Sequence, residues 1–164
     1  MDFKLGPQKT LTEISTTWEF GIDGDSVQLE KDMISFMQQE KGIGLAANQI
    51  GMAKRVFVMG SENIPGFPKP FALFNPRILE KSQDQVIDKE GCLSFPNIWL
   101  QIKRSTWIIA QYQDSSGELH EIKIDGYLSK CFQHEYDHLD GICFIDRVSK
   151  MKLQLAIKKS RKNK

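Results

Sequence analysis

The chain has 164 residues and a formal net charge of +1, so its charge gives no bulk attraction to nucleic acid or to a membrane surface. Its length suggests one domain with a core of its own, and no apolar run is long enough to cross a bilayer. The three cysteines lack the rhythm of a disulfide scaffold, and the polar amino terminus lacks the apolar core of a signal peptide. We therefore expect a cytoplasmic protein with reduced thiols and no membrane association.

The first 24 residues are polar and predict no regular element. A helix is predicted from Ser26 to about Glu40, capped by Asp25 or Ser26, because apolar residues then recur at helical spacing. These residues are Leu29, Met33, Phe36 and Met37. A glycine-rich stretch begins at Gly42, but it follows a helix and not a strand, which argues against a phosphate-binding loop.

Short runs rich in apolar residues predict strands over 55–59, 72–74, 98–102, 107–113 and 119–124. A proline-containing loop over 65–70 separates the first two, and Asn75-Pro76 is expected to end the second. Residues 84–89 lead into a turn around Cys92, which is bracketed by glycine and proline. Ser115-Ser116-Gly117 predicts a hairpin between the last two strands.

The strongest single motif is His134-Glu135-Tyr136-Asp137-His138, on a helix expected to start at Asp125-Gly126 and to stop at Gly141. Positions four apart share one face of a helix, so both imidazoles can reach one metal ion while Glu135 stays beside its water. Such a pentapeptide also arises by chance on a solvated helix, so a third ligand is needed to support the metal site. The predicted fold class is α+β, with antiparallel strands packed around this central helix.

The search for a third ligand is short, because no histidine or glutamate follows His138. This argues against two classes of zinc peptidase, which need a third histidine at the position of Phe144 or a downstream glutamate. Four candidates remain, and they are Cys92, Cys131, Cys143 and His120. Cys131 lies seven residues before His138, roughly 10 Å along the helix, which is too far for one metal to join both. Cys143 lies in an apolar run and His120 is expected to be exposed on a hairpin, so Cys92 in its turn is favoured.

Three segments, Gly42–Gln49, Glu90–Ser94 and Gln133–Gly141, together resemble the signature motifs of the peptide deformylases, in that family's order and spacing. The resemblance extends from about Leu29 to Ser149. It implies a metal-dependent hydrolase that removes the formyl group from the N-terminal formylmethionine of newly made polypeptides and releases formate. The alternative from another class is a catalytically silent homologue that binds nascent chains or ribosomes.

The resemblance also implies roles for individual residues. Cys92, His134 and His138 would hold one divalent metal ion, with Fe(II) the expected native metal and Zn(II), Ni(II) or Co(II) as alternatives. Glu135 would be the proton carrier, and the Gln49 side chain with the Leu93 N–H would stabilise the oxyanion. The substrate-binding residues would be Ile43, Gly44, Leu93, Arg104, Tyr127 and Cys131. A proline-containing motif that many deformylases carry in the amino-terminal arm has only a weak counterpart over 7–11.

The chain after Ser149 is strongly basic, so we expect residues 1–149 to form the catalytic domain and 150–164 a basic carboxy-terminal tail. A solvated terminal helix is the simpler interpretation of this tail. The alternative is docking to ribosomal RNA, because clustered cations release counterions from phosphates, and some deformylases use a terminal helix in this way. No DNA partner is expected, and the compartment could equally be an organelle or a host-cell cytoplasm.

Overall fold

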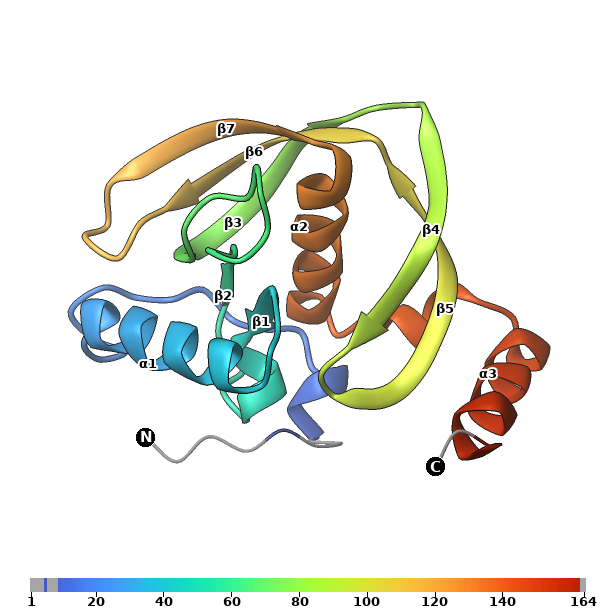
Figure 1. The fold of residues 1–164 in the computed structure, drawn as a ribbon. Helices are drawn as coiled ribbons and strands as arrows, with labels where there is room; N and C mark the ends of the chain where they lie inside the picture. The colour runs from blue at the N-terminus through green and yellow to red at the C-terminus, as the bar shows by residue number, and fades with distance from the viewer. Residues whose placement is uncertain (1–4, 6–8, 163–164) are drawn as a thin grey trace.

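A computed structural model of the chain describes residues 5 and 9–162. A central helix, α2 (Gly126–Leu139), lies between two antiparallel sheets, and α1 (Ser26–Gln39) and α3 (Lys150–Lys162) lie at opposite sides of the molecule (Figure 1). This arrangement confirms the predicted α+β class with strands around a central helix. Among the described residues, no helix has both the length and the apolar character needed to span a bilayer.

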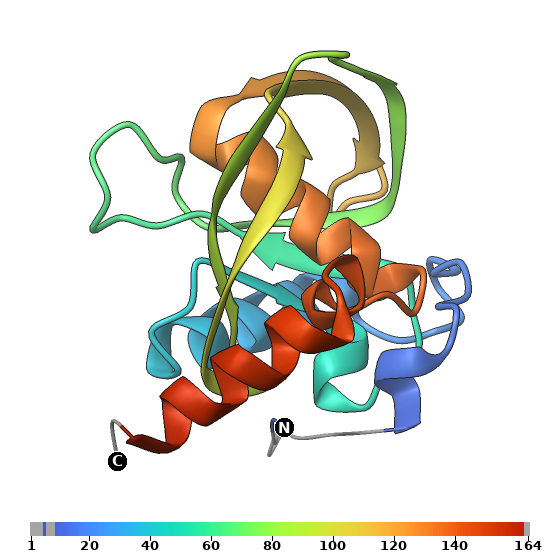
Figure 2. The ribbon, with the colours of Figure 1, turned by 90° about the vertical axis from the view of Figure 1, so that its right-hand side faces the viewer.

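The larger sheet has five strands in the order β1-β2-β3-β6-β7, and all its neighbours are antiparallel. Its strands are β1 (Gly44–Ala46), β2 (Val56–Met59), β3 (Phe71–Lys81), β6 (Trp107–Gln113) and β7 (Leu119–Asp125). The second sheet is one long hairpin, β4 (Gln85–Cys92) with β5 (Phe95–Ser105), which crosses in front of α2 in Figure 2. The predicted turn at Cys92 is therefore confined to the two residues between these strands.

Helix α1 begins where its capping residue predicts. The Asp25 side chain accepts a hydrogen bond from the Gln28 N–H at 3.0 Å, which satisfies one of the free amides of the first turn. Leu29, Met33 and Met37 are buried against the sheet, because they recur on one face of the helix. The predicted helix and its apolar face are both confirmed.

Strand β3 differs from the prediction, because Asn75-Pro76 does not end it. Asn75 has a φ of +50°, and the register against β6 shifts between Phe74 and Arg77, so a bulge absorbs the two residues and the strand continues. The Asn75 side chain stabilises the bulge by accepting from the Trp18 N–H at 2.7 Å and donating to the Trp18 carbonyl at 3.0 Å. These contacts come from a distant segment that the local sequence does not reveal.

The core continues on both faces of the larger sheet. On one face α1 covers β1 and β2, and on the other Phe132 of α2 packs edge-to-face on Phe57, with ring centroids 5.1 Å apart. The amino-terminal arm closes the bottom of α2, since the Ser15 N–H donates to the Leu139 carbonyl at 2.8 Å. Residues 6–8 lie outside the described part of the chain, so the weak motif over 7–11 is represented only by the 3-10 turn Lys9–Thr12.

Candidate metal and catalytic site

Three predicted metal ligands converge at the carboxy-terminal half of α2. The Cys92 Sγ and one ring nitrogen of each of His134 and His138 all lie within 4.8 Å of one another. Cys92 comes from the last position of β4, and the two histidines come from successive turns of α2, with the Cys92 Sγ 3.3 Å from the His138 Nε2. A thiolate and two imidazoles are a donor set that suits divalent first-row metals, so these residues fit the implied ion.

The ring of His134 is oriented by a carboxylate that the sequence did not single out. The His134 Nδ1 donates to Glu90 at 3.0 Å, which leaves its Nε2 free to face the metal site. Burial alone would raise the pKa of Glu90, but hydrogen bonds from His134 and Arg104 outweigh it and lower the pKa to about 2. Glu90 is therefore an anion that fixes both the tautomer and the angle of the imidazole.

Arg104, which the resemblance implied as a substrate-binding residue, is buried against two carboxylates. Its guanidinium is buried, and it donates to both oxygens of Glu90 at 2.8 and 3.0 Å and to Asp137 at 2.5 Å. It does not line the pocket that Cys92 and His134 line. A buried guanidinium needs anionic partners, and two are already supplied by β4 and α2. Arg104 is thus in contact with Glu90, which in turn holds His134, and the contact of Arg104 with substrate stays a prediction.

The other three candidates for the third ligand lie apart from the converging donors. Cys131 is buried in α2 and its thiol donates to the Ile43 carbonyl at 3.5 Å. Cys143 is also buried, and burial raises the pKa of its thiol to about 12. His120 is partly exposed on the β6–β7 hairpin, where its Nε2 lies 2.7 Å from Asp114. The choice of Cys92 among the four is consistent with this geometry.

Glu135 is a buried carboxylate at the edge of the metal site. Its Oε2 has no hydrogen-bond partner among the described residues, and burial raises its pKa to about 7. Gly44 of β1 makes room for this side chain, because a Cβ at that position would lie 2.3 Å from the Glu135 Oε1. A carboxylate with a free oxygen next to the metal ligands can exchange protons with a water or a leaving group.

Gln49 lies on the 3-10 turn Ala47–Ile50 and lines the same cavity as Glu135. Its Oε1 accepts from the Ala46 N–H at 2.8 Å, so the amide orientation is fixed and the Nε2 points toward the cysteine. That Nε2 donates to the Ser94 Oγ at 3.0 Å and lies 3.5 Å from the Cys92 Sγ. An oriented amide donor at this place suits an oxygen that gains negative charge.

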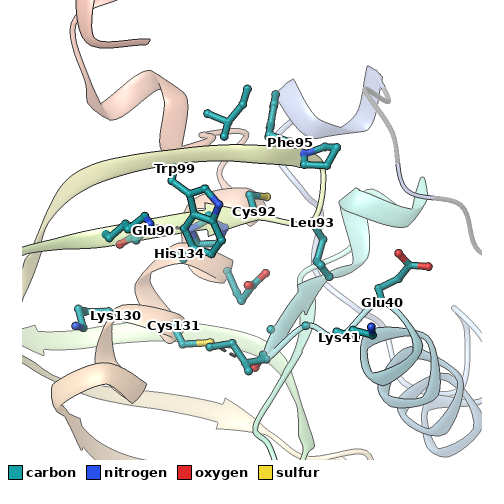
Figure 3. A pocket seen from close by; sticks show the side chains of 18 of the residues that line it. Glu40, Lys41, Glu90, Cys92, Leu93, Phe95, Trp99, Lys130, Cys131 and His134 are labelled. Carbon is teal, nitrogen blue, oxygen red and sulfur yellow. Dashed lines mark hydrogen bonds and ion pairs between the residues drawn. The ribbon is translucent and has the colours of Figure 1, made fainter. Parts of the chain in front are cut away.

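A cavity of about 490 Å³ opens above these groups (Figure 3). Its walls include all the predicted pocket residues except Arg104, and these are Ile43, Gly44, Leu93, Tyr127 and Cys131. Cys92, His134, Glu135 and Gln49 also line it. The volume lies within the range of small-molecule sites, and the apolar walls beside a polar base suit a ligand with one apolar side chain and one reactive polar group.

The sequence prediction missed three residues that shape this site, namely Glu90, Ser94 and Trp99. Glu90 could have been found, because a metal-bound histidine usually donates its second N–H to a carboxylate and Glu90 lies within the cysteine motif. Ser94 and Trp99 depend on how β4 pairs with β5. The residues next to Ser94 and Trp99 in the sequence do not by themselves determine the register between β4 and β5.

Comparison with known proteins gives one consistent result. The family model described as Polypeptide deformylase matches residues 3–154. The peptide deformylase of Wolbachia sp. subsp. Brugia malayi is 42% identical over 152 residues, which cover 88% of this chain and 85% of the relative. That of Rhizobium meliloti is 37% identical over 153 residues, or 93% of this chain and 87% of the relative. The crystal structure of the Ehrlichia chaffeensis peptide deformylase in complex with actinonin superposes with a TM-score of 0.85 at 38% identity, covering 99% and 96% of the two chains. The chain belongs to the polypeptide deformylase family.

Proposed function

We propose that Cys92, His134 and His138 hold the metal ion of this deformylase, and that Glu135 and Gln49 perform the proton transfer and the oxyanion stabilisation. The enzyme is a metal-dependent hydrolase that removes the formyl group from N-terminal formylmethionine and releases formate. The observation that supports these roles is the convergence of the three donors, two of which, Cys92 and His134, line the same cavity as Glu135 and Gln49. The relatives support this activity and not a catalytically silent homologue.

In this proposal each residue has one task in the hydrolysis. A divalent metal, when bound, would supply Lewis-acid polarisation of the formyl group and of the attacking water. Glu135 takes a proton from the water and returns it to the leaving amine, which its buried carboxylate with one free oxygen permits. Gln49 donates to the oxygen that becomes negative, together with the N–H of Leu93.

The methionine side chain would occupy the apolar part of the cavity. Ile43, Leu93 and Cys131 supply apolar surface there, and the flexible thioether suits such an irregular pocket. Actinonin is present in the solved Ehrlichia chaffeensis relative, so we expect it to compete with formyl peptides in this cavity.

The test of these roles is formate release from formyl-Met-Ala-Ser by anaerobically prepared protein, with Glu135→Gln as the variant. We expect the wild type to release formate, and the variant to lose activity about 100-fold to 10,000-fold while it keeps its metal. An active Glu135→Gln would remove Glu135 from the mechanism. A folded, metal-loaded wild type that releases no formate would instead favour the silent homologue that binds nascent chains.

We further propose Fe(II) as the native metal, with Zn(II), Ni(II) and Co(II) as replacements. Air should inactivate the iron form by oxidising the metal or the Cys92 thiolate, whereas nickel and zinc forms should survive. The measurement is the activity of each metal form before and after exposure to air. Equal losses in the iron and nickel forms would contradict this proposal.

We also propose that residues 150–164 form a basic appendage to a catalytic domain of residues 1–149, and that it docks on ribosomal RNA. The helix α3 presents Lys158, Lys159 and Arg161 to solvent, while Leu153 and Ala156 pack with the buried side chains of β5. Docking would place the enzyme where translation occurs, in the cytoplasm or the equivalent compartment of an organelle or host cell.

Charge reversal tests this docking better than truncation, because truncation would uncover the apolar contact with β5. A triple variant with Lys158→Glu, Lys159→Glu and Arg161→Glu should bind ribosomes more weakly, with a smaller dependence on salt. The matched control reverses three exposed lysines on other elements, Lys31, Lys81 and Lys103. Equal binding by the two triple variants would exclude α3 as the docking element.

A further inference from the structure

A tryptophan side chain lies exposed at the mouth of the catalytic cavity. Trp99 of β5 lines the cavity and is 56% exposed, whereas Trp18 is only 3% exposed and belongs to the core (Figure 3). An indole is the largest apolar side chain, and its exposure forfeits the free energy that burial would supply. Surface aromatic residues beside a binding cavity are typical sites of ligand contact.

The indole of Trp99 is held in place by β4. A Cβ at Gly91 would lie 2.9 Å from the Cζ3 and 3.0 Å from the Cε3 of its six-membered ring, so only glycine lets the ring approach this closely. On the same strand, the Lys89 Nζ lies 4.8 Å from the ring centroid as a cation–π contact. The open side of the ring is therefore a preorganised apolar surface that needs little ordering when a ligand arrives.

This surface lies close to the proposed metal ligand Cys92. Gly91 immediately precedes Cys92, so the indole is next to the residue proposed to hold the metal. An extended peptide advances about 3.3–3.6 Å per residue. A chain whose formyl group is at the metal ligands therefore passes the mouth of the cavity with its second and third residues.

The charges around the mouth are predominantly positive. Lys41 and Lys89 line the cavity and are exposed, and the exposed anion among the described lining residues is Glu40. Lys130 also lines it, but it is buried and paired with Asp88. A peptide with a basic side chain near this mouth would be repelled, while an apolar one would find the indole.

We propose that Trp99 is a specificity-determining residue that packs against the side chain of the second or third residue of the formyl peptide. The preferred substrates are formylmethionyl peptides with an aromatic or large apolar residue at one of these positions, over peptides with lysine or arginine there. This inference rests on the deformylase activity and adds a sequence preference beyond the formylmethionine.

The experiment compares kcat/KM for formyl-Met-Phe-Ser, formyl-Met-Ala-Phe, formyl-Met-Lys-Ser and formyl-Met-Ala-Lys. In the wild type we expect kcat/KM for the better phenylalanine peptide to be about threefold to tenfold higher than kcat/KM for the peptide with lysine at the same position. An aromatic contact would supply a difference of this size. In Trp99→Ala that ratio should fall below about twofold, mainly through KM, and Trp99→Phe should keep most of it. The matched control is Ile87→Ala, an exposed apolar side chain of β4 outside the cavity, which should keep the wild-type ratio.

The outcomes separate this inference from the activity on which it rests. If no peptide yields formate, the deformylase assignment itself fails. If all four peptides are processed equally by the wild type, or if Trp99→Ala keeps the wild-type ratio, the proposed role of Trp99 is wrong. Binding of the same peptides to Glu135→Ala, followed by tryptophan fluorescence with and without Trp99→Phe, gives a second readout that does not require turnover.

Discussion

The polar side chains that α2 turns toward the interior are paired with the β4–β5 hairpin. Gln133 donates to the Ser105 carbonyl at 2.9 Å and accepts from the Ser105 N–H at 3.1 Å, so the helix is tied to the end of β5. His134 and Asp137 reach Glu90 and Arg104 in the same way. Glu135 and His138 are different, since the Glu135 Oε2 and the His138 Nδ1 have no hydrogen-bond partner among the described residues. Burying a carboxylate oxygen without a hydrogen-bond partner destabilises the folded state, which fits a group retained for catalysis.

The contact between Gly44 and Glu135 gives a prediction for a single substitution. The change Gly44→Ala would place a Cβ within 2.3 Å of the Glu135 Oε1, so the carboxylate must move. A displacement of about 1 Å at a catalytic group can lower the rate about 100-fold. We expect kcat for formate release to fall by at least about tenfold while the bound metal is retained, and steady-state kinetics with metal analysis would measure both. Unchanged kcat in a folded Gly44→Ala would show that Glu135 needs no fixed position.

At the level of single elements, local patterns predicted the helices well and the strands only in part. The periodicity of Leu29, Met33 and Met37 determines α1, because a helix forms from contacts within four residues. Strand β3 extends past Asn75-Pro76 because Trp18 and β6 supply partners from elsewhere in the chain. The chemistry and motif spacing of the candidate metal ligands and of Glu135 point to them in the sequence, and their roles stay proposals. Ser94 and Trp99 could not be placed from the sequence in this way, because the pairing of β4 with β5 brings them to the site.

The turn between β6 and β7 gives a prediction about pH. Hydrogen bonds from the Ser116 hydroxyl and from His120 lower the pKa of Asp114 to about 2, against 3.8 for the free side chain. The folded state therefore binds this proton less readily than the unfolded state. The stabilisation is fully present above about pH 4 and is lost as the pH falls toward 2. Asp114→Asn should remove this part of the pH dependence of the free energy of unfolding, measured by denaturant titration from pH 5 to pH 2. If the free energy of unfolding depended on pH equally in the wild type and in Asp114→Asn, Asp114 would not be the source of this dependence.

For the whole molecule, the catalytic site exists only when three parts of the fold meet. The segment of β1 and its 3-10 turn brings Gly44 and Gln49, the β4–β5 hairpin brings Cys92, and α2 brings the two histidines and Glu135. The hairpin crosses α2, as Figure 2 shows, so a metal ion held by Cys92 and the histidines would join the two sheets through the helix. Metal binding should therefore also stabilise the fold, because a ligand that binds only the folded state shifts the unfolding equilibrium.

The most direct test of this account is to measure bound metal and formate release on the same anaerobic samples of wild type, Cys92→Ala and Cys143→Ala. Both cysteines are free thiols, but only Cys92 lies with the histidines. We predict that Cys92→Ala loses the metal and the formate release from formyl-Met-Ala-Ser, and that Cys143→Ala keeps both. A Cys92→Ala protein that still bound metal stoichiometrically and released formate at the wild-type rate would contradict the proposed metal site.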